Sequence, residues 1–178
     1  MLNKAIFLDR DGVINEVKTS RVRFVNQPHQ FYFLEGSLEA IKILSQAGYL
    51  IFVVTNQGGV GLGYLSIDQL QSIHDYMVDE IKSSGGNIHD ISCCIHKPHE
   101  GCACRKPEPG MLLELAQKYD IDLSSSYMIG DRETDIEAGS RAGTKTILLC
   151  SDDASRHIIQ ADKLFKNLLE ASFYIAAN

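Results

Sequence analysis

The stretch at residues 5–15 reads Ala5-Ile6-Phe7-Leu8-Asp9-Arg10-Asp11-Gly12-Val13-Ile14-Asn15. Its apolar run, bounded by turn signals, predicts a buried strand over residues 4–8. Asp9 and Asp11 then lie where the strand leaves the sheet, the edge at which open α/β sheets bind ligands. Two carboxylates this close need a cation to stay ionised, or one of them keeps a proton. The pair suits a metal-assisted nucleophile beside a general acid/base. An Asp-x-Asp motif taken by itself is more often a solvated acidic turn.

The size and composition of the chain predict one globular domain over residues 1–178. Hydrophobic residues make up 44% and charged residues 22%, which is ordinary for a soluble protein. The formal net charge of −6 offers no basic face, so we expect no nucleic-acid partner. We find neither a signal peptide nor an apolar run of membrane-spanning length. We therefore expect a cytoplasmic protein without membrane contact, working as a monomer.

Apolar patterning predicts strands that alternate with helices along the chain. Further strands are expected over residues 49–54, 91–95, 127–129 and 146–150, and helices over residues 37–47, 66–83, 110–119 and 134–142. The tail, residues 152–174, is helical only towards its end. This alternation predicts an α/β, Rossmann-like, mostly parallel sheet with helices on both faces. The gaps between motifs leave no room for a separate cap domain, and residues 17–33 form an aromatic-rich flap over the site.

Three more polar groups follow predicted strands or precede predicted helices. Thr55 ends the second strand, where a hydroxyl and backbone N–H groups can hold a phosphate oxygen, although a plain turn is commoner. Lys106 precedes a helix and could neutralise a phosphoryl group, although a surface lysine is the default. Asp131 follows a strand and could ligate a hard cation such as Mg²⁺ or cap the next helix. Because these positions share one sheet edge, we expect them to meet.

These motifs, in this order across residues 5–139, resemble the haloacid dehalogenase superfamily of phosphatases. The resemblance implies that Asp9 forms an aspartyl-phosphate, and that Asp11 protonates the leaving alcohol and later activates water. It implies that Thr55 and Lys106 hold the phosphoryl group. It also implies a Mg²⁺ ion bound by Asp9, Asp131 and the backbone carbonyl of Asp11. Phosphoryl transfer depends on positioning and charge neutralisation, which these residue types supply.

A second cluster combines thiols and an imidazole within eleven residues. Four of the five cysteines lie between residues 93 and 104, and in a reducing compartment this clustering indicates metal rather than disulfides. Three thiolates and one imidazole make a closed, structural Zn²⁺ site. The candidate ligands are Cys94, His96, Cys102 and Cys104. Cys93 and His99 are substitutes for one of them, and Cys150 is expected to be a buried apolar residue.

This cysteine-rich loop, directly before Arg105-Lys106-Pro107, is similar to two zinc-containing phosphatase families. They are the D-glycero-D-manno-heptose 1,7-bisphosphate phosphatases and the histidinol-phosphate phosphatases. The resemblance implies a small phosphorylated substrate, the sugar bisphosphate in the first case, from which the C7 phosphate is removed. Histidinol phosphate and nucleic-acid 3′-phosphate ends remain alternatives, as does a phosphate-binding module without catalysis. The candidate substrate-binding residues are Asn56, Gln57, Arg105 and Arg132.

Overall fold

In the part of the chain that the structure describes, six parallel strands form one sheet in the order β3-β2-β1-β4-β5-β6. The computed structural model describes residues 2–150 and 160–178. The strands are β1 (Ala5–Leu8), β2 (Leu50–Asn56), β3 (Asp90–Cys94), β4 (Tyr127–Gly130), β5 (Lys145–Leu149) and β6 (Lys163–Phe165). The order reverses between β1 and β4, and the carboxyl edge at such a switch point is where open α/β sheets bind ligands.

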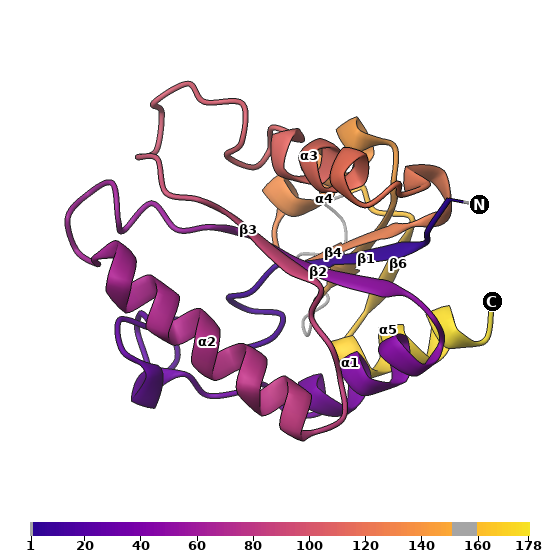
Figure 1. Ribbon diagram of the computed structural model, residues 1–178, viewed down its shortest axis with the longest axis horizontal. Coiled ribbons are helices and arrows are strands. Elements are labelled where there is room, and N and C mark those ends of the chain that lie inside the picture. Colours follow the sequence, from indigo (N-terminus) through magenta and orange to yellow (C-terminus); the bar gives the residue numbers. More distant parts are fainter. Residues whose placement is uncertain (1, 151–159) are drawn as a thin grey trace.

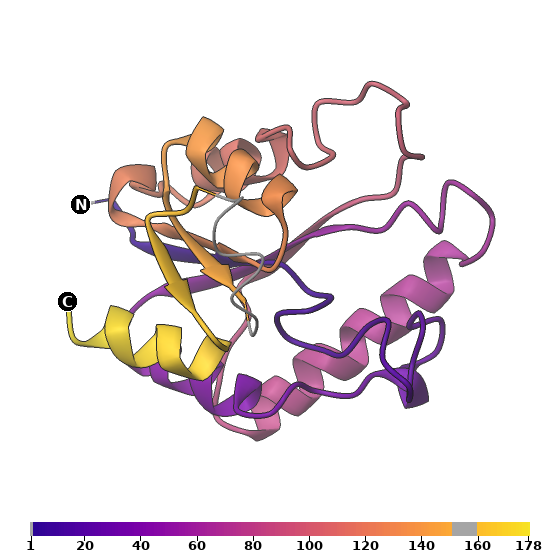
Figure 2. The same ribbon diagram turned by 180° about the vertical axis from the view of Figure 1, so that it is seen from behind.

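Five helices cover the two faces of the sheet (Figures 1 and 2). They are α1 (Ser37–Gln46), α2 (Ile67–Ser83), α3 (Gly110–Lys118), α4 (Glu133–Ala142) and α5 (Leu168–Ala176), with short 3₁₀ turns η1 (Pro28–Gln30) and η2 (Leu123–Ser125). Helices α1, α2 and α5 lie on one face, and α3 and α4 lie on the other. This is the three-layer α/β arrangement predicted from the sequence.

Alternation along the central strands builds the two larger hydrophobic cores of the described residues. In β1, Ile6 and Leu8 pack towards α1, α2 and α5, whereas Ala5 and Phe7 pack towards α3 and α4. All four are fully buried, because a central parallel strand has helices on both faces. Burial of each large apolar side chain is worth about 1.5–3 kcal/mol. The cores therefore hold β1 firmly, and the aspartates that follow it are held with it.

The predicted strands and helices are confirmed, with ends that differ by one or two residues. Thr55 and Asn56 belong to β2 itself rather than to the turn after it. In the tail, α5 confirms the helical end, and β6 is an additional strand that we did not predict. The first part of the tail prediction, over residues 152–159, lies outside the described residues.

The flap over residues 17–33 is partly anchored in the core. Val22, Val25 and Phe31 are buried in the core with α1, α2 and α5, while Phe24 is half-exposed. Within residues 2–150 and 160–178, no separate cap domain stands over the carboxyl edge of the sheet. In the same residues, every helix is too short or too polar to cross a membrane.

Candidate active site

The carboxyl edge of the sheet brings together the predicted catalytic and phosphate-binding residues. Asp9 follows β1, Thr55 ends β2 and Asp131 follows β4, on both sides of the switch point. A small cavity of about 40 Å³ lies beside Asp9 and Thr55. Its lining residues come from β2, α4 and the loops after β1, β3 and β4: Asp9, Asp11, Thr55, Asn56, Lys106, Arg132, Thr134 and Asp135.

Lys106 is a buried cation at the floor of this cavity, not the surface lysine of the default interpretation. Its side chain is 2% exposed, and its Nζ lies 2.9 Å from Asp9 Oδ1 and 2.6 Å from Asp135 Oδ1. Nζ also donates to the Val54 carbonyl oxygen at 2.7 Å, so its three donors are all used. Burial works against the charge, but the two carboxylates raise the pKa of Lys106. The lysine therefore remains a cation in place to neutralise charge.

Asn56 fixes the backbone that carries this lysine. Its side-chain amide donates to the Lys106 carbonyl oxygen at 3.0 Å, and its Oδ1 accepts the Lys106 N–H at 3.0 Å. The pair of hydrogen bonds joins the end of β2 to the loop before α3, 50 residues further along the chain. Asn56 thus has a positioning contact that the sequence did not indicate.

Three carboxylates, that of Asp9 among them, form a group that fits a divalent cation. One oxygen from each of Asp9, Asp131 and Asp135 lies within 4.8 Å of the others. Burial raises the pKa of Asp9 to about 7 against the opposing charge of Lys106, and the Asp135 charge adds to the increase. Burial raises the pKa of Asp131 to about 6, again with Asp135 adding to it. The raised pKa values, which persist with Lys106 beside Asp9, indicate that this group carries more negative charge than its cationic neighbours offset.

Asp131 carries a second sign of a missing partner. Its Oδ1 is buried and accepts no hydrogen bond from the described residues, and the Nε of Arg132 lies 4.0 Å from it. Gly12, with φ +89°, passes so close that a Cβ there would lie 2.2 Å from Asp131 Oδ2. Because it has no side chain, glycine at residue 12 leaves room for the Asp131 carboxylate. Carboxylate oxygens that accept no internal hydrogen bond are suitable ligands for a hard cation such as Mg²⁺.

Asp11 is held by donors from three directions. The Arg10 guanidinium donates to both of its carboxylate oxygens at 3.0–3.2 Å. Asn15 donates to Oδ1 at 2.9 Å, and Gln57 donates to Oδ2 at 3.0 Å. Burial opposes ionisation, but Arg10, Asn15 and Gln57 together hold the pKa of Asp11 below its usual value. Sequence reasoning missed Arg10 and Asn15. The place of Arg10 between two acids was a signal that could have found it.

The four candidate zinc ligands form a compact cluster in the cysteine loop, residues 94–104. The Cys104 sulfur lies 3.2 Å from Cys94 Sγ and from His96 Nδ1, and 3.5 Å from Cys102 Sγ. Cys94 Sγ is 3.5 Å from His96 Nδ1 and 3.6 Å from Cys102 Sγ. A tetrahedron with metal–sulfur bonds of about 2.3 Å has edges of about 3.8 Å, so the donor set fits a zinc ion.

The two substitute ligands stand apart from this cluster. Cys93 packs in the core below α2 and lines a cavity there, on the opposite face of β3 from Cys94. His99 lies at the exposed tip of the loop with φ +64°. Arg105, the first residue after the loop, donates from Nη1 to the His96 carbonyl oxygen at 3.2 Å. The loop and the arginine are thus joined directly.

Two larger cavities flank the small one. One, of about 720 Å³, lies between the flap and residues 56–65; the other, of about 580 Å³, lies beside the cysteine loop. Asn56 and Arg132 line both of these cavities and the small one, Gln57 lines the first, and Arg105 lines the second. The four predicted substrate-binding residues therefore border the space next to Asp9.

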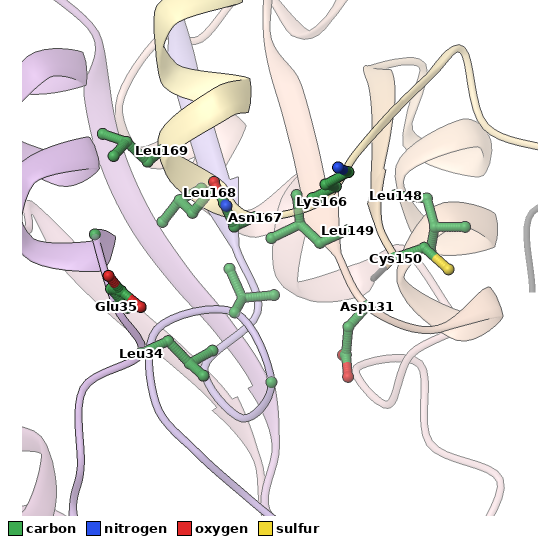
Figure 3. A pocket seen from close by; sticks show the side chains of 13 residues that line it. Leu34, Glu35, Asp131, Leu148, Leu149, Cys150, Lys166, Asn167, Leu168 and Leu169 are labelled. Atoms are coloured by element: carbon green, nitrogen blue, oxygen red, sulfur yellow. The ribbon is translucent and has the colours of Figure 1, made fainter. Parts of the chain in front are cut away.

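A further cavity of about 660 Å³ opens on the other side of Asp131 (Figure 3). Asp131 stands on one of its walls, and Glu35 lies across the opening from it. Apolar side chains around β5 and α5, including Leu149 and Leu168, complete much of its lining, and Asp9 is not among them. The clustered charges of Asp9 and Lys106 belong to the small cavity, which identifies that cavity as the chemical centre.

Comparisons with known proteins agree with this geometry. Residues 103–171 match the family described as "HAD-hyrolase-like". The D-glycero-beta-D-manno-heptose-1,7-bisphosphate 7-phosphatase of Helicobacter pylori (strain ATCC 700392 / 26695) is 40% identical over 148 residues, 83% of each chain. The D-glycero-alpha-D-manno-heptose-1,7-bisphosphate 7-phosphatase of Burkholderia mallei (strain ATCC 23344) is 39% identical over 175 residues, 94% of this chain and 90% of that one.

A solved structure shares the whole fold. The D,D-heptose 1,7-bisphosphate phosphatase from B. bronchiseptica, complexed with magnesium and phosphate, superposes with a TM-score of 0.89. It is 34% identical, and the match covers 98% of both chains. With relatives this similar over most of its length, the chain belongs to the HAD-like family of D-glycero-D-manno-heptose-1,7-bisphosphate 7-phosphatases.

Proposed function

We propose that this phosphatase removes the C7 phosphate of D-glycero-D-manno-heptose 1,7-bisphosphate through an aspartyl-phosphate on Asp9. The observation that carries the proposal is the pairing of Asp9 with the buried ammonium of Lys106, 2.9 Å away, at the floor of the small cavity. An anionic nucleophile needs such a cation beside it to approach a phosphate that is itself anionic. The activity for which the relatives are named and the phosphate bound in the neighbouring structure support the proposal.

The reaction needs two displacements at phosphorus. Asp9 attacks the phosphorus, the bond to the sugar oxygen breaks, and Asp11 gives a proton to that oxygen. Water then attacks the aspartyl-phosphate, and Asp11 takes the proton from it. Thr55 and Lys106 hold the phosphoryl oxygens during both steps. These roles account for the burial of Asp9, Thr55 and Lys106 around one small cavity.

The acidic group fits a Mg²⁺ ion. We assign it to Asp9, Asp131 and the backbone carbonyl of Asp11, and magnesium in the neighbouring structure supports this assignment. When bound there, the ion supplies positive charge against the phosphoryl oxygens. Asp135 supports the site by accepting the Arg132 N–H at 3.1 Å while it binds Lys106 at 2.6 Å.

The part of the substrate that does not react belongs in the two flanking cavities. Arg132 borders both of them, and Arg105 offers a planar fork that suits a second phosphate or sugar hydroxyls. Asn56 can contact the substrate while it holds Lys106. One donor bond of Gln57 goes to Asp11 and another to Thr55 Oγ1 at 2.9 Å, so this residue also orders the site.

The cysteine loop would hold a structural Zn²⁺ ion through Cys94, His96, Cys102 and Cys104, whose mutual distances fit a tetrahedral cage. Such a cage has no open position for substrate. Its contribution is to fix the chain that leads into Arg105 and Lys106. We also propose that residues 1–178 form a single phosphatase domain that works as a cytoplasmic monomer. Its partner would be a small phosphorylated sugar, with no nucleic acid or membrane involved.

An assay of phosphate release with Mg²⁺ tests the substrate. The three substrates are heptose 1,7-bisphosphate, histidinol phosphate and a 3′-phosphorylated oligonucleotide, with the Asp9→Asn chain as a blank. We expect the bisphosphate to give the highest kcat/KM. Phosphorus NMR of its product should show only the anomeric phosphate at C1. A higher kcat/KM on histidinol phosphate, or a product that keeps the C7 phosphate, contradicts the proposal.

A further inference from the structure

Behind Asp11 lies a buried polar contact that reaches into the neighbouring helix α2. Arg10 is 1% exposed, and its Nη1 lies 3.2 Å from Nε2 of His74. His74 is 5% exposed and is 64 residues away in the sequence. The other donors of the Arg10 fork, Nε and Nη2, point at the Asp11 carboxylate. One guanidinium therefore bridges His74 and Asp11.

The chemistry of this contact fixes the state of the histidine. A guanidinium only donates hydrogen bonds, so Nε2 of His74 accepts and the ring proton lies on Nδ1. Burial and the charge of Arg10 lower the pKa of His74 to about 4, which keeps the ring neutral. A neutral acceptor satisfies Nη1 without competing for the charge of Arg10. The whole charge of Arg10 thus remains available to Asp11.

Both ends of Arg10 are therefore fixed. Its carbonyl oxygen accepts the N–H groups of Ile14 at 2.9 Å and Asn15 at 3.2 Å, which holds the loop after β1. Its guanidinium is planar, so the contact of Nη1 with His74 also sets the orientation of the edge that faces Asp11. If residue 74 offered no acceptor, Nη1 would be a buried donor without a partner and the fork would move to find one.

We propose that Arg10 and His74 are positioning residues that hold the Asp11 carboxylate where it takes a proton from the attacking water. This inference rests on the proposed function. In the step concerned, the water oxygen bonds to phosphorus, the bond between phosphorus and Asp9 breaks, and the water proton passes to Asp11. The three donors around Asp11 favour the anionic carboxylate that this step needs. The role of His74 is to orient the strongest of these donors, the Arg10 guanidinium, towards Asp11.

The test separates the two displacements with p-nitrophenyl phosphate. Its leaving phenolate needs no proton, so kcat/KM reports the first displacement with little dependence on Asp11. Hydrolysis of the aspartyl-phosphate still needs the base. We expect His74→Leu, with Mg²⁺ present, to lower kcat about tenfold while kcat/KM changes less than about twofold. In acid-quenched samples, the steady-state fraction of phosphorylated protein should rise.

Two further variants distinguish positioning from packing. His74→Gln places an amide oxygen near the position of Nε2, so we expect kcat close to that of the unmodified chain. Ile73→Val shortens a neighbouring buried side chain of α2 and keeps the imidazole of His74 that contacts Arg10, so it should change neither constant appreciably. If His74→Leu does not fold, Arg10→Lys carries the same test, because lysine keeps the charge and loses the fork.

The possible outcomes are distinct. If His74→Leu lowers kcat and kcat/KM equally, the positioning role is overturned and the proposed function stays intact. The same holds if neither kcat nor the fraction of phosphorylated protein changes in this variant. Failure of His74→Gln to restore kcat also overturns it. If the unmodified chain releases phosphate from none of the substrates above, the proposed function is overturned together with the inference that rests on it.

Discussion

The side chains around the small cavity carry an excess of negative charge. The four carboxylates of Asp9, Asp11, Asp131 and Asp135 face two buried cations, Arg10 and Lys106, and the half-exposed Arg132, whose Nε lies 4.0 Å from Asp131 Oδ1. Negative charge therefore remains in excess when all of these groups are ionised. Buried charges without partners are costly, and the raised pKa values of Asp9 and Asp131 express that cost. A divalent cation would offset this excess. The charge count and the oxygen donors thus lead to the same kind of ion.

The first prediction concerns Asp9. Asp9→Asn keeps the shape of the side chain and removes the attacking charge, so we expect kcat to fall by about a thousandfold or more. Lys106 keeps its contacts with Asp135 and the Val54 carbonyl, so the fold should persist. Steady-state kinetics and circular dichroism check both points. Turnover near that of the unmodified chain, in a folded variant, would exclude Asp9 as the nucleophile.

Single residues were predictable from sequence when the chemistry lay next to a strand end. Asp9, Asp131 and Thr55 were found in this way, because parallel strands deliver their carboxyl ends to one edge. Lys106 was ambiguous, since its burial depends on contacts with Asp9 and Asp135 from other elements. His74 could not be found, because its contact with Arg10 exists only once α2 packs against the sheet. Local patterns carry no information about such a contact.

Among the helices and strands, the buried elements were the easiest to predict from the sequence. Central strands such as β1 and β2 are apolar on both faces and were recognised from continuous hydrophobic runs. Strand β6 is a three-residue edge strand with two exposed side chains, so its sequence lacks that pattern. It is placed by tertiary contacts instead. Just before it, Asp162 accepts hydrogen bonds from Thr146 N–H and Oγ1 at 2.7 and 2.9 Å.

The second prediction concerns the cysteine loop as an element. Residues 95–109 contain no helix or strand, so the metal cage would be their main internal support (Figure 1). Cys104→Ser removes the sulfur that touches the other three ligands. We expect zinc content to fall from about one ion per chain, and activity to fall with it, because Arg105 and Lys106 follow directly. The helical and strand content measured by circular dichroism should remain.

The matched control for this prediction is Cys93→Ser. Cys93 is the sequence neighbour of Cys94 but packs on the other face of β3, so zinc content should not change. Metal analysis of both variants, purified without added zinc, makes the comparison. If the unmodified chain carries no zinc, and the thiols of Cys94, Cys102 and Cys104 react freely with a thiol reagent, the cage is wrong.

At the scale of the whole molecule, the sheet order explains why distant segments make one site. The order reverses between β1 and β4, so the loops after these strands diverge to opposite faces and leave a crevice. Asp9 and Asp131 follow the two strands that border it. The flap and the cysteine loop then provide walls on either side. The parallel sheet with helices on both faces was predictable from alternating strands and helices. The strand order was not predicted, and the shapes of both walls depend on loops without periodic patterns.

The third prediction links the stability of the whole chain to pH and Mg²⁺. The pKa values of Asp9 and Asp131, about 7 and 6, are raised from 3.8, so the folded chain binds protons more tightly there than the unfolded chain. The stability that these two groups contribute is therefore lost as pH rises from about 4 to about 7. His74 has the opposite slope between pH 4 and 6.5, because its pKa is lowered to about 4. Comparing melts with and without Mg²⁺ at one pH cancels the contribution of His74.

Mg²⁺ competes with protons for the carboxylates of Asp9 and Asp131, so its stabilising effect should grow as pH rises through 6 and 7. We expect 10 mM Mg²⁺, about a saturating concentration, to raise the Tm by about 5 °C at pH 8 and by less than half of that at pH 5.5. Thermal melts followed by circular dichroism, in Mg²⁺-free buffer without a chelator so that bound zinc stays in place, measure both differences. Asp131→Asn should remove most of the gain at pH 8. An increase in Tm that is independent of pH, or that survives in Asp131→Asn, would place the cation elsewhere on the chain.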